Sequence, residues 1–441
     1  MISGSLFPIL AVLLAMMQQE PFSGNAVQGP IQPGQYLGVV SCAGSGCHGS
    51  PAPVENANVL MNEYDTWVHA GSPSHVRAYE ALLLPRSRRI ARNLRLPQPA
   101  EKSKICLDCH ALNVSESQQA GTVELTDGVS CESCHGPASG WRARHVEEGW
   151  THEDSVRAGM IDLRHLPTRA RTCLECHMGK PGQIVDHELI AAGHPVLTFE
   201  LDNFTESRHV PPHWKEDPTD TTHGFRAWAV GQAVTFHESA RNAAWIAGDE
   251  RWPEFAQMSC AGCHHPLREG AWRQERGFQH TAGLPLWGSA RWIALRHLVA
   301  AVAPEEERAL DADVRSLARE IARMRNSRAS AEAARAVSAR LERIVPRIEN
   351  ARWSEREIRD LIRRIAADPA MTSWDRQDAE QATYALVSIS NYLVRANPAL
   401  LRSDLVRNID SMYRILDRAA YPDEFDRAEF IRALQAVREG T

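Results

Sequence analysis

The sequence predicts a mainly α-helical protein built in two parts, because its first two-thirds and its last third follow different patterns. Residues 27–284 hold all ten cysteines and eighteen of the nineteen histidines, with little regular apolar periodicity. Residues 285–441 contain no cysteine and no lysine, and their apolar residues recur at helical spacing. We therefore expect short helices joined by long loops in the first part, and an all-α helical domain in the second.

The first part contains five segments in which two cysteines are followed directly by a histidine. Four of them leave two residues between the thiols, and the first leaves four. The segments are 42–48, 106–110, 131–135, 173–177 and 260–264. This pattern is the attachment signature of a c-type haem, in which two thiols add to the two vinyl groups of one porphyrin and the histidine binds the iron.

The motifs use every cysteine of the chain once, which predicts five covalently bound haem c groups. The candidate tethers are Cys42, Cys47, Cys106, Cys109, Cys131, Cys134, Cys173, Cys176, Cys260 and Cys263. The candidate iron ligands within the motifs are His48, His110, His135, His177 and His264.

Three other kinds of cysteine site compete with haem attachment. Zinc ribbons join Cys-x-x-Cys pairs two by two, which would leave a fifth pair over. Structural disulfides fit an even cysteine count but do not require the histidines. A thioredoxin-like redox pair would stand alone within a βαβ pattern. Haem attachment accounts for all five motifs, and a plain disulfide is its main rival at the stretched first motif.

The N-terminal segment has the character of a secretory signal. Its apolar run, Leu6 to Met17, is too short to span a bilayer, and Gly24–Ala26 supplies small residues for cleavage. No lysine or arginine precedes the run, so an uncleaved membrane anchor stays open as the alternative. We predict a signal peptide over residues 1–26 and an exported, periplasmic protein, because bacteria attach haem c outside the cytoplasm.

Residues 27–284 provide 258 residues for five haems, or about 52 for each. A unit of that size rarely builds a stable core from side chains alone and normally needs a covalent or metal staple. We expect the porphyrins to be both the staple and the packing partner of the short helices.

The last part shows ordinary helical signals. Leu310, Val314, Leu317, Ile321 and Met324 form one apolar stripe. Ser354 and Glu357 are spaced as a capping box. Five prolines, at positions 304, 346, 369, 398 and 422, divide this part into about six expected helices.

Charge divides unevenly between the two parts. Residues 285–441 contain 26 arginines and 24 acidic residues, a net charge of +2, which leaves −8 for the first 284 residues. This balance argues against nucleic-acid binding, which needs a basic surface. It would allow a basic redox partner to be attracted, although a merely solvated acidic surface accounts for it equally well.

Several segments around the motifs resemble the multihaem cytochrome c-554 family. They are residues 65–75, with Trp67 and Ser74-His75, then residues 128–138, residues 186–195 and residues 260–274. The similarity covers roughly residues 36–287 and leaves out the last part. The family has four motifs where this chain has five, so the order of the haems cannot be transferred.

The resemblance implies a second, distal histidine on the irons. His75 and His145 match family positions; His69 is the rival of the first, and His152 and His165 are weaker rivals of the second. The other candidates are His187, His194 and His213. His265 is a further histidine that could reach a neighbouring haem.

Paired histidine ligands favour low reduction potentials and an iron that changes charge with little rearrangement. The first functional hypothesis is therefore an electron carrier that works between redox partner proteins. The second is an oxidoreductase that binds a small nitrogen-oxide substrate at a five-coordinate haem, and the third is a scaffold whose helical part docks other proteins. The Cys-x-x-Cys-Lys motif of pentahaem nitrite reductase is absent, which counts against that enzyme.

Overall fold

The computed structural model describes residues 34–57, 59–69, 74–120, 122–206, 220, 222–260, 263–264, 287, 290–419 and 424–441. The predicted signal segment, His213, His265 and residues 265–274 of the resemblance lie outside these ranges. Within them the chain is helical and contains only three isolated β-bridges in place of strands. The mainly α prediction is confirmed.

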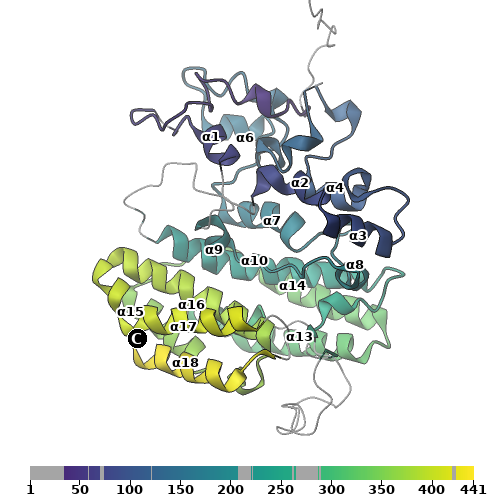
Figure 1. The fold of residues 1–441 in the computed structure, drawn as a ribbon. Helices are drawn as coiled ribbons and strands as arrows, with labels where there is room; N and C mark the ends of the chain where they lie inside the picture. The colour runs from purple at the N-terminus through teal and green to yellow at the C-terminus, as the bar shows by residue number, and fades with distance from the viewer. Residues whose placement is uncertain are drawn as a thin grey trace, which may run out of the picture.

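The first part consists of short helices joined by long loops, drawn in the upper half of Figure 1. Its α-helices are α1 Glu63–Val68, α2 Ala78–Leu82, α3 Pro85–Asn93, α4 Lys104–His110, α5 Cys131–His135, α6 His152–Arg157, α7 Leu166–His177, α8 His187–Ala192 and α9 Leu201–Glu206. Its 3-10 turns are η1 Val39–Ser41, η2 His75–Arg77, η3 Ala100–Lys102, η4 Glu116–Gln118, η5 Leu125–Asp127, η6 Ala138–Gly140 and η7 Phe255–Gln257.

The remainder is a bundle of longer helices, drawn in the lower half of Figure 1. They are α10 His223–Ile246, α12 Trp292–Val302, α13 Pro304–Arg323, α14 Ser327–Asn350, α15 Glu355–Ala366, α16 Arg376–Ala396, α17 Asp404–Arg418 and α18 Arg427–Glu439, with the turns η9 Pro369–Ser373 and η10 Pro398–Arg402. The apolar stripe of α13 is buried and ends where Met324 takes a left-handed conformation. The capping box at Ser354 forms as expected.

One sequence signal within the bundle was wrong. Pro346 was expected to separate two helices, but α14 runs through it to Asn350. The residues that surround the proline, among them Ile344, Val345 and Ile348, are buried in the core. The burial of these side chains against the neighbouring helices outweighs the loss of one backbone hydrogen bond.

Helix α10 connects the two parts. It contacts α7 and α9 on one side and α12, α14 and α16 on the other. Sixteen of its residues are buried, on all sides of the helix, so it has no single apolar stripe for sequence analysis to find. The main hydrophobic core runs from Leu166 through α10 to Val437. It therefore crosses residue 284, and a separate domain beginning at residue 285 stays a prediction.

Outside this core, the first part has only small apolar clusters. One holds five buried residues around Leu82 and Leu107, and two others hold three each, around Trp141 and around Ile90. Such clusters are too small to organise so many short helices by themselves. They surround a large cavity, which is the candidate site.

Candidate haem-binding site

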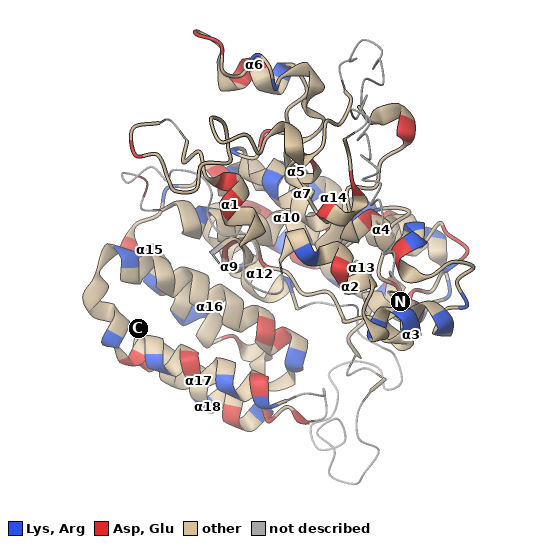
Figure 2. Cartoon of the chain, turned by 45° about the horizontal axis from the view of Figure 1, so that its top comes forward, with Lys and Arg blue, Asp and Glu red and all other residues tan. Residues whose placement is uncertain are grey.

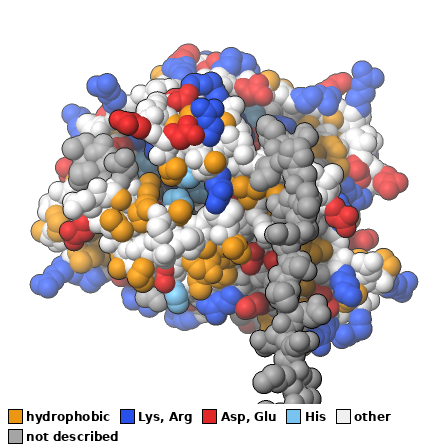
Figure 3. Space-filling view, turned by 90° about the horizontal axis from the view of Figure 1, so that it is seen from above, with side chains coloured by type: hydrophobic (Ala, Val, Ile, Leu, Met, Phe, Trp, Pro, Cys, Tyr) orange, Lys and Arg blue, Asp and Glu red, His pale blue; other side chains and the backbone are white. Residues whose placement is uncertain are grey.

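The first part encloses a cavity of about 2160 Å³. That volume is more than twice the upper end for a small-molecule pocket, about 1000 Å³. The cysteines and the histidine of the first four motifs all line it. Figure 3 looks onto this part of the molecule, where histidine side chains lie in a hollow bordered by hydrophobic ones.

Local helix geometry places the groups of most motifs. The second, third and fourth motifs end α4, α5 and α7, so the two cysteines, three residues apart, lie on one face with the histidine directly after. In the fifth, the amide of His264 donates to the Cys260 carbonyl at 2.7 Å, as in a helical turn. The stretched first motif has no helical spacing. It folds as turns in which the His48 amide donates to the Cys42 carbonyl at 3.2 Å.

A buried carboxylate ties the third motif to the segment that precedes the first. Glu132, between the two cysteines of α5, is only 3% exposed. It accepts backbone hydrogen bonds from Leu37 at 3.0 Å, Gly38 at 2.7 Å and Ala138 at 2.8 Å. Sequence analysis missed this residue, because an acidic side chain at a variable motif position gives no sign that it is buried.

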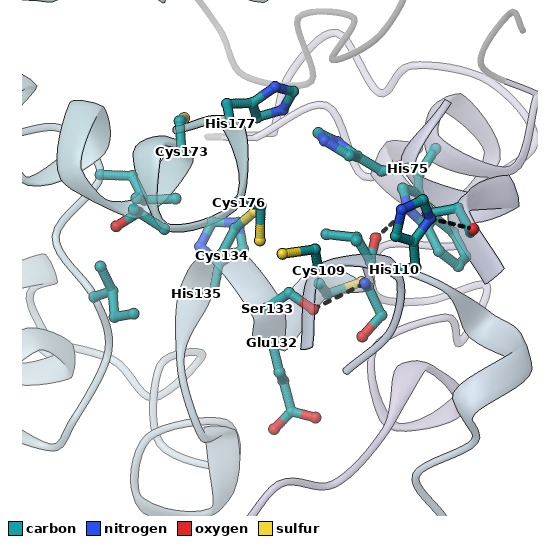
Figure 4. Close-up of a pocket in the computed structure, with 18 of the residues that line it drawn as sticks. His75, Cys109, His110, Glu132, Ser133, Cys134, His135, Cys173, Cys176 and His177 are labelled. Atoms are coloured by element: carbon teal, nitrogen blue, oxygen red, sulfur yellow. Dashed lines mark hydrogen bonds between the residues drawn. The ribbon is translucent and has the colours of Figure 1, made fainter. Parts of the chain in front are cut away.

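Four pairs of histidine rings join a motif histidine to one of the candidate distal histidines. The centroid separations are 6.1 Å for His48 and His145, 6.0 Å for His177 and His75, 6.4 Å for His110 and His194, and 6.4 Å for His264 and His187. In each pair the two residues come from different segments of the chain. Figure 4 shows His75 and His177 facing each other across the cavity.

These separations match two imidazoles on opposite sides of one metal ion. A metal–imidazole nitrogen bond is about 2.0 Å long. The centroid of a five-membered ring with ordinary bond lengths lies about 1.1 Å behind that nitrogen. Two such rings on one axis are therefore about 6.2 Å apart. The four observed values lie within 0.2 Å of this distance.

The ring nitrogens are also disposed for metal binding. Nδ1 of His48 contacts the Glu63 carboxylate at 2.9 Å, and Nδ1 of His110 contacts the Ala78 carbonyl at 2.8 Å. On the distal side, Nδ1 of His194 contacts the Pro195 carbonyl at 2.8 Å, and Nδ1 of His145 contacts the Arg142 carbonyl. A hydrogen bond at Nδ1 fixes the tautomer and leaves Nε2 for a metal.

Three histidines outside the four pairs have an oxygen partner at Nε2. Nε2 of His152 contacts Asp162 at 3.0 Å, and Nε2 of His297 contacts Asp368 at 2.9 Å. His165 contacts Thr168 through Nδ1 at 2.8 Å and lies 3.5 Å from Glu349 through Nε2. His69, the rival of His75, has a side chain 72% exposed and contacts its own helix.

The thiols of different motifs meet inside the cavity. Cys42 lies within hydrogen-bond reach of Cys131, and Cys109 lies within reach of Cys176. Figure 4 shows Cys134, Cys176 and Cys109 at its centre. Burial, and after it the charge of the neighbouring Cys134, raises the pKa of Cys173 to about 12.

The rival cysteine sites receive no support from these contacts. All ten cysteines are free thiols. In the part of the chain that the structure describes, no three His, Cys, Asp or Glu side chains converge as a bare metal ion would require. At four of the five motifs the arrangement supplies two histidines together with two thiols, which fits a haem.

Comparison with known proteins agrees with this geometry. Residues 41–136 match the family described as cytochrome c554 and c-prime. The match contains the first three motifs and His75, and it stops before the fourth. No curated protein matches the chain, nor does any solved structure. Over residues 41–136, the chain is therefore similar to the cytochrome c554 family, which implies covalent binding of c-type haem there.

Proposed function

We propose that this cytochrome is an exported electron carrier that holds five haem c groups and passes electrons between redox partner proteins. The observation that carries the proposal is the set of four histidine ring pairs spaced for one iron each. No helix in the described ranges is both long and apolar enough to cross a membrane.

The proposed axial pairs are His48 with His145, His110 with His194, His177 with His75 and His264 with His187, and the cysteines of each motif are the proposed tethers. His135 and His213 remain proposed ligands as well. When bound, each haem would supply an iron that changes between the ferrous and ferric states. At the four motifs with histidine pairs, two protein nitrogens would leave an iron no open position for a substrate, which favours a carrier over an enzyme.

Contacts between the motifs support a continuous series of sites. Cys42 meets Cys131, which joins the first motif to the third. Cys134 lies near Cys173 and Cys176, which joins the third motif to the fourth.

The series continues from the fourth motif to the second, where Cys176 meets Cys109. The fifth motif follows through α8, because His187 begins this helix and His194 lies two residues beyond its end. The proposed order of the sites is therefore first, third, fourth, second and fifth.

The test is a count of covalent haems in the purified, exported protein, combined with its electron paramagnetic resonance spectrum. We expect a pyridine haemochrome value of five haems per chain and low-spin signals from the irons with paired histidines. Removal of the colour by acid–acetone would refute covalent attachment. A dominant high-spin signal from the oxidised protein would refute the carrier and favour the oxidoreductase.

A further inference from the structure

An exposed basic surface lies beside the second motif, in a part of the chain that is otherwise acidic. Residues 77–104 hold eight basic and two acidic residues, a net charge of +6, whereas the rest of the first 284 residues carries −14. All eight basic side chains are exposed: Arg77, Arg86, Arg88, Arg89, Arg92, Arg95, Lys102 and Lys104. We call them the α3 basic surface, because half of them belong to α3 (Figure 2).

Four arginines on and just after α3 have no acidic partner among the residues that the structure describes. Arg88, Arg89, Arg92 and Arg95 form no ion pair with any carboxylate in the described ranges. By contrast, seven arginines of α13–α17 pair with an acidic residue three or four positions away on the same helix. The absence of such pairs is therefore a property of α3 and not of arginine in this chain.

The local sequence makes these charges unfavourable for the helix itself. Arg89 lies three residues from Arg86 and from Arg92, and like charges at this spacing repel. The first turn of α3 contains no acidic residue, so nothing offsets the positive end of the helix dipole. Arg92 in the last turn favours the helix dipole, and Arg86 bonds a backbone carbonyl, but Arg88 and Arg89 bring the helix no such benefit. A binding role would explain these two charges.

The opposite face of α3 belongs to the candidate site. Ser87 and Ile90 line the cavity, and Ile90 packs against Leu189 and Ala192 of α8. The Nε of Arg86 donates to the Gly193 carbonyl at 2.9 Å, next to His194. Arg88, Arg89 and Arg92 do not line the cavity, and the width of the helix, about 10–12 Å, therefore separates them from the His110–His194 pair.

Apolar side chains accompany the charges. Leu83, just before α3, is 42% exposed and does not line the cavity. Leu84 and Ile105, 55% and 46% exposed, also line the cavity. Exposed leucines among arginines are typical of protein interfaces, which have an apolar centre and are rich in arginine.

We propose that the α3 basic surface is the docking site of an acidic electron-transfer protein, which exchanges electrons with the chain at its second motif. This inference rests on the proposed function. An acidic partner is favoured over an anionic membrane because the surface backs directly onto a histidine pair, a placement that lipid binding does not require. Charge complementarity would accelerate encounter by about 10-fold to 1000-fold at low salt.

The experiment uses the full-length haem-loaded protein and flavodoxin, an acidic electron-transfer protein, as the probe. Stopped-flow kinetics give the second-order rate of reduction by flavodoxin hydroquinone, and calorimetry gives the affinity for oxidised flavodoxin. The test variant is Arg88→Glu/Arg89→Glu/Arg92→Glu, and the Arg→Gln triple is a milder version. The matched control, Arg335→Glu/Arg356→Glu/Arg432→Glu, changes the net charge equally at exposed arginines of the bundle.

At low ionic strength we expect the α3 variant to lose at least about tenfold in rate and affinity, with the difference vanishing at high salt. The control variant should stay within about twofold of wild type. Equal losses in both triples, or none in the α3 variants, would overturn the docking site. The docking site would also be overturned if the α3 variants lost binding to phosphatidylglycerol vesicles but reacted normally with flavodoxin. Loss of a wild-type dimer in the α3 variants, measured by light scattering, would overturn it as well.

Neutral riboflavin semiquinone separates this inference from the proposed function. If riboflavin semiquinone and flavodoxin each reduce all variants at the wild-type rate, only the proposed docking site is refuted. If riboflavin semiquinone cannot reduce the wild-type protein, the electron carrier itself is refuted.

Discussion

The carboxylate of Glu132 offers the sharpest test of how the site is held together. It accepts three backbone hydrogen bonds in a buried position, two of them from residues 37 and 38, just before the first motif. Each donor left unsatisfied by its removal costs about 1–3 kcal/mol. The substitution Glu132→Ala should therefore cost at least about 3 kcal/mol, and Glu132→Gln, whose amide oxygen can still accept, about 1–3 kcal/mol.

The loss should be local and measurable in the haem-loaded protein. A cost of about 3 kcal/mol corresponds to an acceleration of amide exchange by about 100-fold. We expect it at the Leu37 and Gly38 amides, read by hydrogen-exchange mass spectrometry. Glu175, which lies between the cysteines of the fourth motif, is the matched control, since it is exposed and pairs with Lys180. Unchanged exchange in Glu132→Ala, or equal acceleration in Glu175→Ala, would refute the reasoning.

Three further predictions concern other parts of the molecule. His75→Ala should add a high-spin signal equivalent to one iron, whereas His69→Ala should leave the spectrum unchanged; the reverse result would show that the ligand was assigned wrongly. Burial, together with the neighbouring Asp375, raises the pKa of Asp378 well above 3.8. The neutral carboxyl therefore contributes its full stability below pH 3.8, and this contribution is lost as the pH rises through the raised pKa. Asp378→Asn should flatten the dependence of Tm on pH. Equal pH dependence of Tm in the variant and the wild type would contradict this. Gly231→Ala should destabilise the protein by about 1–3 kcal/mol, because a Cβ there would lie 2.7 Å from that of Leu201; a stabilised variant in chemical denaturation would show that α9 can move away.

The motifs were the strongest part of the sequence signal, because the chemistry of attachment dictates both residue type and spacing. The candidate distal histidines His75, His145, His187 and His194 were chosen by resemblance, and each lies beside a motif histidine. Which ring meets which motif could not be predicted, since it depends on how loops far apart in the sequence fold around the cavity.

Other features were hidden for identifiable physical reasons. Helix α10 is buried on all sides, so it lacks the stripe by which amphipathic helices are recognised. Glu132 and Glu175 both stand between motif cysteines, yet one is buried and the other exposed. The basic run of α3 was printed in the sequence, but a net charge of −8 for the whole segment concealed it. The net charge of a segment therefore does not show whether one part of its surface could bind an acidic partner.

The helical bundle is best understood as the support of two of the five proposed sites. Leu174, between the cysteines of the fourth motif, is 1% exposed and belongs to the main core that α10 shares with the bundle. Beside the fifth motif, the Ser259 hydroxyl donates to Asp375, the residue that caps α16. A haem held through its tethers needs a backbone that does not shift when the iron changes charge. By fixing the rear of these two motifs, the bundle supplies that rigidity where the small clusters of the first part cannot.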